Sequence, residues 1–285
     1  IRVVTRWLIE GKDLAPLPSY QVSDHRRVVT ILNARKDTVR RNAYRDLLRY
    51  ARLVAGYAEG AIPELASYEG ATLADTFTGK ELARTPEHAV RILRKVIDQT
   101  ERKVFRGEKV PASEKVVSFF EDHTDIVVKG RRDTEYGHKV FLTGGASAMI
   151  LNCLIVRGNP ADSDQYQRLL ENHQQQYGRM LRQVTADGGF ASKQNLAFAG
   201  ENGVKNAVFA KKRGLSILDM AKSCWVYKKL KNFRAGIESG ISALKRTFGL
   251  DRCTWPGWKG FKRYVLSAVV SYNLLVIAPI RPASA

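Results

Sequence analysis

The chain has 285 residues, of which 44% are hydrophobic and 26% charged, which excludes a disordered chain, a collagen and a small disulfide scaffold. Lys and Arg number 47 against 28 Asp and Glu, so the net charge is +19 and an anionic partner is expected. Nucleic acid is the leading candidate, and an anionic membrane surface is the second. The three cysteines, Cys153, Cys224 and Cys253, form no CxxC pair, which disfavours a zinc ribbon or disulfide framework and suits a reducing cytoplasm.

Residues 1–113 are predicted to form a basic helical region. In residues 35–57, apolar side chains recur at helical spacing, and four arginines form a second stripe beside them. The stripe consists of Arg41, Arg45, Arg49 and Arg52. Such a run is usually a solvated helix face, but this one is nearly single-signed in a basic chain. Contact with DNA phosphate is therefore an equal alternative.

The rest of the helical region is predicted to be interrupted. Gly60, Pro63 and Gly70 fall in a more acidic stretch that indicates a short helix or a linker. Thr85 and Pro86 predict the N-cap and first residue of a further helix, which extends to about residue 103. Basic residues between 91 and 109 are a second candidate for phosphate contact.

Short β-prone runs begin after residue 113. Residues 116–120 and 126–128 are the first two. Residues 138–142 and 148–156 are joined by a Gly-rich turn and predict an antiparallel hairpin. The second strand of this hairpin is nearly all apolar, which is typical of a strand buried on both faces.

Strands and helices alternate farther along the chain. Strands are predicted at 182–186 and 204–210, with a helix at 192–203 between them, which implies parallel pairing. Residues 215–285 predict further helices; the apolar run 265–280 is short for a membrane span and predicts a buried helix. We therefore expect an α/β fold in which one mixed sheet contains the antiparallel hairpin and then the parallel strands.

Asp187 is the first candidate site residue. It follows an apolar strand and precedes Gly188 and Gly189, and open α/β sheets place their sites at such carboxyl ends. Two glycines after a carboxylate would let a ligand or backbone approach closely. The alternative is an ordinary turn aspartate, which is common at such a position.

Glu238 is the second candidate. It lies in residues 233–248, a periodic helix whose charged edge carries Arg234, Glu238 and Lys245 at separations of four and seven. This edge would border whatever the apolar face of the helix packs against. The alternative is a solvent-exposed ion pair between Arg234 and Glu238, which would contribute only ~0.3–0.5 kcal/mol.

The segments around both residues resemble motifs of the DDE insertion-sequence transposases. Residues 185–192 with Asn195 resemble the second-aspartate motif, and Arg234, Glu238 and Lys245 resemble the Arg-Glu-Lys part of the Tyr-Arg-Glu-Lys signature. The Tyr of the signature would fall at Lys231. Within this family the chain is most similar to the ISNCY-type group, through residues 23–25, 44–48, 114–118, 121–125 and 135–139.

This resemblance implies an RNase H-like catalytic core at 114–285, with residues 1–113 as a helical insertion. Acidic residues, Asp187 and Glu238 among them, would hold two Mg²⁺ ions for DNA cleavage and strand transfer. Arg234 and Lys245 would contact phosphate near the cut. The partners would be terminal inverted repeats and target DNA. The implied setting is a homodimer on DNA in the cytoplasm, associated with the nucleoid and not with a membrane.

The chain differs from the family pattern at the first catalytic Asp, for which it has no matching residue. The strand of this Asp would precede the helical insertion and so fall before Ile1; we therefore expect the chain to be an N-terminally truncated transposase. Asp125 is a weak replacement candidate. Two other function classes stay open: a catalytically inactive DNA-binding remnant of a transposase, and a host nuclease with an RNase H fold.

Overall fold

The computed structural model describes residues 20–67, 69, 72–129 and 133–278. The chain forms two compact units, Ile1–Asp122 and His123–Ala285. The helical structure expected for residues 1–19 lies outside the described residues. The functional division proposed between residues 113 and 114 stays a prediction.

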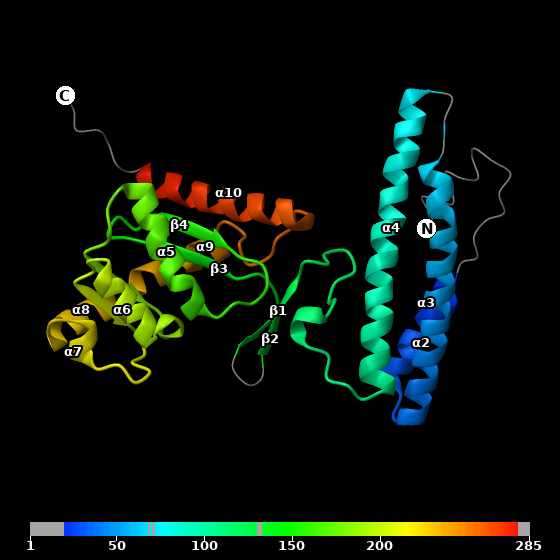
Figure 1. Cartoon of the computed structure of the whole chain (residues 1–285), viewed down its shortest axis with the longest axis horizontal. Coiled ribbons are helices and arrows are strands. Elements are labelled where there is room, and N and C mark those ends of the chain that lie inside the picture. The colour runs from blue at the N-terminus through cyan, green and yellow to red at the C-terminus, as the bar shows by residue number, and fades with distance from the viewer. Residues whose placement is uncertain (1–19, 68, 70–71, 130–132, 279–285) are drawn as a thin grey trace. The chain divides into compact units, whose positions relative to one another are not determined.

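The first unit is helical, as expected. Helices α2 (Gln21–Asn33), α3 (Asp37–Ala66) and α4 (Leu73–Thr100) are followed by a π-helix, η1 (Glu101–Phe105), and a 3₁₀ turn, η2 (Ala112–Glu114). The long helices α3 and α4 lie side by side over most of their length (Figure 1). Small buried residues line their contact, so that the two helices approach closely. They include Ala55, Ala58, Ala61 and Ala83, with Leu65 and Val90 beside them.

Two helix limits differ from the sequence-based expectation. The break predicted at Gly60 and Pro63 is absent, because α3 continues through both to Ala66. The helix start predicted at Pro86 is wrong, since α4 begins at Leu73 and contains Pro86 in its interior. Pro86 removes one helical hydrogen bond. Burial of Val90 and neighbouring apolar residues against α3 outweighs that loss, because tertiary packing contributes most of the stability of helices.

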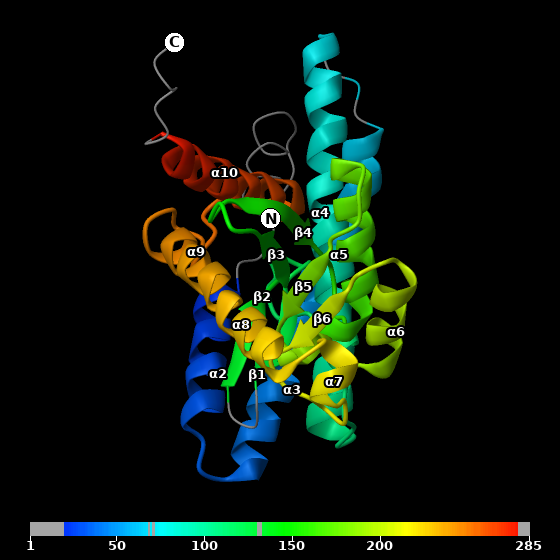
Figure 2. The ribbon, with the colours of Figure 1, turned by 90° about the vertical axis from the view of Figure 1, so that its left-hand side faces the viewer.

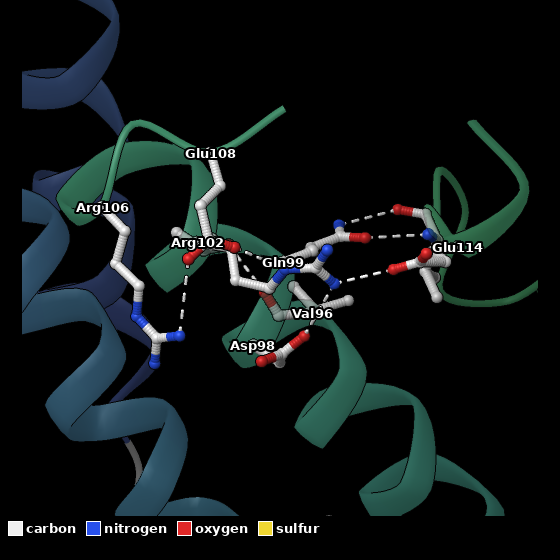
Figure 3. Close-up of polar contacts among 9 residues, drawn as sticks. Val96, Asp98, Gln99, Arg102, Arg106, Glu108 and Glu114 are labelled. Atoms are coloured by element: carbon white, nitrogen blue, oxygen red, sulfur yellow. Dashed lines mark hydrogen bonds and ion pairs between the residues drawn. The ribbon is translucent and has the colours of Figure 1, made fainter. Parts of the chain in front are cut away.

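A polar cluster fastens the segment after α4 to the end of that helix (Figure 3). The guanidinium of Arg102 donates to Glu108 at 3.0 Å and Glu114 at 2.7 Å. The side-chain amide of Gln99 donates to the Val116 carbonyl at 3.0 Å and accepts from the Val116 N–H at 2.9 Å. Val116 is therefore held by side-chain contacts, and residues 116–120, predicted as a β-prone run, form no strand.

The described residues of the second unit contain three pairs of strands. β1 (Asp125–Lys129) pairs antiparallel with β2 (Asp133–Gly137), and β3 (Val140–Gly144) pairs antiparallel with β4 (Ile150–Ile155). The latter is the hairpin predicted from sequence. β5 (Gln183–Ala186) pairs with β6 (Asn206–Phe209) in parallel, as predicted. Among the described strands no ladder joins one pair to another, so the single mixed sheet expected from the sequence is not seen.

Helices cover the β3–β4 and β5–β6 pairs on two sides (Figure 2). Helices α5 (Asp162–Tyr177) and α6 (Lys193–Glu201) lie on one side, and α8 (Cys224–Phe233) and α9 (Ala235–Arg246) on the other. A short helix, α7 (Ile217–Met220), precedes α8, and α10 (Gly257–Ile277) closes the unit. In the described part of the chain, none of the helices combines the length and the apolar character that crossing a membrane requires.

The core of the second unit has two main parts. One surrounds Phe209 of β6, with residues from α5, α6 and α8. The other packs Leu244 of α9 against Ile150 of β4 and Tyr272 of α10. Both Phe209 and Leu244 are fully buried. The strand ends and the helix that carry the candidate site residues are therefore anchored by apolar packing.

Candidate active site

Asp187 and Glu238, 51 positions apart in the sequence by their numbers, are joined in the structure through one arginine. Nη1 of Arg234 donates to Oδ1 of Asp187 and, at 2.7 Å, to Oε1 of Glu238. Because one nitrogen contacts both oxygens, these oxygens cannot lie farther apart than two hydrogen-bond lengths, about 6 Å. The sequence offered the Arg234–Glu238 pair as the alternative to a site, and the family resemblance implied that Asp187 and Glu238 act together; the contact between Arg234 and Asp187 was not predicted.

The helix α9 presents Glu238 from its first turn. The preceding residue, Ile237, packs toward β3, where its side chain approaches Gly144 so closely that a Cβ there would lie 2.7 Å from Ile237 Cδ1. Gly240, two residues after Glu238, allows Tyr272 of α10 to approach. A Cβ on Gly240 would lie 3.1 Å from the Tyr272 hydroxyl. These contacts fix the rotation of α9 about its axis, so the charged edge that carries Glu238 faces outward. A carboxylate in the first turn is also favoured by the helix dipole.

The loop after β5 holds Asp187 at its start. Gly188 and Gly189 form a 3₁₀ turn, η3 (Gly188–Phe190), and side chains of the protein, not its backbone, occupy the space that a Cβ would need. A Cβ on Gly188 would lie 2.6 Å from Lys211, and one on Gly189 would clash with Asp162. The sequence predicted close approach at the two glycines but could not name Lys211 or Asp162, which come from distant segments.

Asn195 fixes the far end of this loop. Its side chain is buried and donates to the carbonyls of Phe190 at 2.9 Å and Ser163 at 2.8 Å. Its backbone N–H donates to the N-cap Ser192 at 3.0 Å. Asn195 therefore ties the start of α6 to the Asp187 loop and to α5, and its role here is structural.

The surroundings of the two carboxylates are open and basic. The side chains of Asp187 and Glu238 are 62% and 56% exposed, whereas that of Arg234 is only 23% exposed. Burial acts to lower the pKa of Arg234, but its contacts with Glu238 and Asp187 outweigh this, so its pKa is raised. The guanidinium is therefore a permanent positive charge beneath two solvent-facing carboxylates.

A shallow depression of about 480 Å³ extends from Glu238 along α9. Lys245 and Arg246 from the last turn of the helix line it, together with Asp251. Lys245 lies seven residues after Glu238 and is therefore on the same side of the helix. The depression thus combines two carboxylates, Glu238 of the site and Asp251, with two cations, Lys245 and Arg246.

The family of the chain follows from a comparison with known protein families. The family described as Transposase DDE domain matches residues 120–274, more than half of the chain and nearly all of the second unit. The chain belongs to the DDE transposases. No curated protein and no solved structure matched it in the corresponding searches.

The matched region of the transposase contains both candidate carboxylates and the arginine between them. The membership supports DNA as its partner and a divalent metal ion as its cofactor. It implies an RNase H-like fold, with which the parallel β5–β6 pair and the β3–β4 hairpin are compatible. Assignment to the ISNCY-type group stays a prediction.

Asp125, the weak candidate for a third carboxylate, has a different environment in this transposase. Its Oδ2 lies 2.7 Å from Nδ1 of His138, and Nε2 of His138 lies 2.7 Å from Nδ1 of His123. Trp258 packs edge-on against both imidazoles. Within the described ranges, no three His, Cys, Asp or Glu side chains are grouped so that they could hold one metal ion, so the structure does not bring Asp125 to Asp187 and Glu238.

The arginine stripe of the transposase divides into two kinds of residue. Arg52 is ion-paired with Glu101, so its charge is already compensated. The partners of the other three are uncharged: Arg41 donates to the Phe105 carbonyl, Arg45 to Asn42 and Arg49 to the Tyr50 hydroxyl. In the second basic segment, Arg94 and Arg102 are paired with carboxylates. Sequence reasoning could not separate these cases, because the carboxylates that pair with Arg52 and Arg94 come from other helices, Glu101 from η1 and Glu59 from α3.

Proposed function

We propose that this transposase cleaves DNA at the ends of an insertion sequence and transfers the strands to target DNA, in a Mg²⁺-dependent reaction. Asp187 and Glu238 would hold the metal, while Lys245 and Arg234 would contact the phosphates beside it. The observation that carries the proposal is the shared contact of Asp187 and Glu238 with Nη1 of Arg234. Two carboxylates from a strand end and a helix therefore converge on one cationic atom.

The donor set fits a hard divalent cation. Both side chains offer carboxylate oxygens, the ligands that Mg²⁺ prefers, and both are largely open to solvent. Their convergence on the positively charged Nη1 indicates a position where positive charge is stabilised. When bound, Mg²⁺ supplies activation of the attacking hydroxyl and stabilisation of the leaving oxygen in phosphodiester cleavage. A third carboxylate of the family's set is not part of this cluster in the described chain.

The other residues of the site would bind and orient DNA. Lys245 and Arg246 border the depression next to Glu238, so a phosphate held there would lie beside the carboxylates. In the helical unit, Arg41, Arg45 and Arg49 have no acidic partner among the described contacts and are available for further phosphate contacts. Assembly as a homodimer on paired DNA ends is part of the proposal.

The proposal is tested with the conservative variants Asp187→Asn and Glu238→Gln in the complete transposase. Each removes a metal-binding charge at nearly constant shape. We expect loss of cleavage of a duplex that carries the terminal repeats of its own element, by more than a hundredfold, with DNA affinity within about threefold of the parent. Gln194→Ala, on the exposed surface of α6, is the matched control and should cleave normally.

Three outcomes distinguish the open alternatives. Full cleavage by either variant would show that the substituted residue holds no metal. DNA binding without cleavage by the parent protein, under any divalent cation, would favour an inactive DNA-binding remnant. Cleavage that ignores the terminal repeats would favour a host nuclease.

A further inference from the structure

Arg234 contacts both carboxylates through a single nitrogen, and another of its nitrogens is left without a partner. Nη1 contacts both Asp187 and Glu238, whereas Nε is buried and has no hydrogen-bond partner. Most buried polar groups are paired, and an unpaired donor is costly. The present position of the guanidinium is therefore set by its attraction to the two carboxylates, and not by a complete set of hydrogen bonds.

We infer that Arg234 is an exchangeable placeholder that keeps metal out of the Asp187–Glu238 pair until DNA phosphate draws the guanidinium away. The inference rests on the proposed function, because it assigns a metal to these carboxylates. A divalent cation bound to both oxygens would occupy the space that Nη1 now fills. It would also neutralise the carboxylate charge that Nη1 now neutralises. Metal and guanidinium are thus alternative partners of the same carboxylates.

The exchange is chemically matched. Guanidinium groups bind phosphate through two parallel hydrogen bonds. A DNA phosphate would therefore engage two nitrogens of Arg234, whereas both present carboxylate contacts use Nη1 alone. The carboxylates prefer a hard divalent cation. The two present contacts are also inexpensive to break, because Asp187 and Glu238 are more than half exposed and water screens exposed ion pairs.

This exchange couples the two ligands. When a phosphate binds Arg234, the guanidinium leaves the two carboxylates, and their affinity for metal rises. By thermodynamic reciprocity, bound metal raises the affinity for DNA by the same factor. Metal would therefore be loaded mainly on DNA-bound protein. The device would restrict cleavage chemistry to a site that already holds its substrate.

The decisive measurement is metal affinity without DNA. Binding of Mn²⁺ to the complete transposase is followed by electron paramagnetic resonance of the free ion. Arg234→Gln should bind Mn²⁺ more tightly than the parent by about 5–150-fold, the usual range for coupled sites. Lys231→Gln removes a positive charge from an exposed position one turn earlier and should change the affinity by less than about twofold.

A second arm adds a short DNA duplex. DNA should tighten Mn²⁺ binding to the parent more than to Arg234→Gln, because the variant has no placeholder to release. Arg234→Lys keeps the charge on a shorter, unforked side chain and should lie between the two. Arg234→Lys also replaces Arg234→Gln in both measurements if the Gln variant fails to give a normal circular dichroism spectrum and melting curve.

The outcomes separate the two proposals. If Asp187→Asn and Glu238→Gln leave Mn²⁺ binding unchanged, the proposed metal site itself is wrong. If they weaken binding but Arg234→Gln and Arg234→Lys bind Mn²⁺ no more tightly than the parent, only the placeholder role is overturned. A gain for Lys231→Gln equal to that for Arg234→Gln would reduce the effect to general electrostatics and would also overturn it.

Discussion

Arg52 on α3 is ion-paired with Glu101, the first residue of the π-helix that follows α4. The pair joins two segments of the helical unit, so one arginine of a stripe that appears uniform in the sequence has a structural partner. Arg49 and Arg45, one and two turns earlier on the same helix, contact only neutral groups among the described residues. The stripe should therefore respond unequally to substitution.

We expect the double variant Arg45→Gln/Arg49→Gln to flatten the salt dependence of DNA binding. Each lost phosphate contact should reduce the slope of log K against log salt by ~0.9. Arg52→Gln should leave the slope unchanged and lower the free energy of unfolding by no more than ~1 kcal/mol. Fluorescence anisotropy titrations at several salt concentrations measure the slopes. Equal slopes for the parent and the double variant would show that this face is merely solvated.

Asn195→Ala should destabilise the transposase by about 1–3 kcal/mol, because it leaves the carbonyls of Phe190 and Ser163 without their donor. Denaturant unfolding followed by circular dichroism measures the change. Gln194→Ala, on the exposed side of the same helix, is the control and should fall within ±0.5 kcal/mol. A stability for Asn195→Ala equal to the control would contradict the structural role assigned to Asn195.

The buried His138 predicts a loss of stability in mild acid. Burial lowers its pKa; Asp125 opposes this shift, while His123 and Arg157 add to it. The folded protein therefore holds neutral His138 at a pH where the unfolded chain, with a His pKa of about 6.5, is already binding protons. The stability that His138 contributes is present above pH ~6.5 and is lost as the pH falls toward its lower folded-state pKa.

This pH dependence can be assigned by substitution. His138→Asn should reduce the fall in unfolding free energy between pH 7 and pH 5. Asp125→Asn removes the group that opposes the shift, so the loss, which still begins near pH 6.5, should extend to lower pH. It should leave Mn²⁺ affinity unchanged, since Asp125 is held by His138 and not by the Asp187–Glu238 pair. A clear drop in Mn²⁺ affinity for Asp125→Asn would instead make Asp125 a metal ligand.

Arg102→Ala should loosen the segment that follows the π-helix. Its carboxylate partners Glu108 and Glu114 lie on that segment, and their contacts raise the pKa of Arg102. We expect faster amide hydrogen exchange across residues 106–117. Arg84→Ala breaks an exposed pair within α4 and should leave this exchange unchanged. Equal protection in the two variants would show that the Gln99–Val116 hydrogen bonds alone hold the segment.

Local patterns in the sequence determined much of this protein. Apolar periodicity indicated the long helix α3 and the helix that carries Glu238, because the helical repeat is a property of each segment alone. The hairpin β3–β4 and the parallel pair β5–β6 followed from turn residues and connection lengths. Motif resemblance around Asp187 and Glu238 indicated the family, which the match to residues 120–274 then showed.

Tertiary structure decided the features that depend on distant partners. Pro86 lies inside α4 because burial against α3 outweighs its missing hydrogen bond, and no local signal reports that burial. Among the described strands the three pairs are not joined in one sheet, and the sequence could not report this because lateral pairing between strands is long-range. Arg234 pairs with Asp187 as well as Glu238, and Arg52 with Glu101, only because the fold brings those charges within hydrogen-bond distance. Electrostatic attraction acts through space, and the sequence gives the charges without the distances.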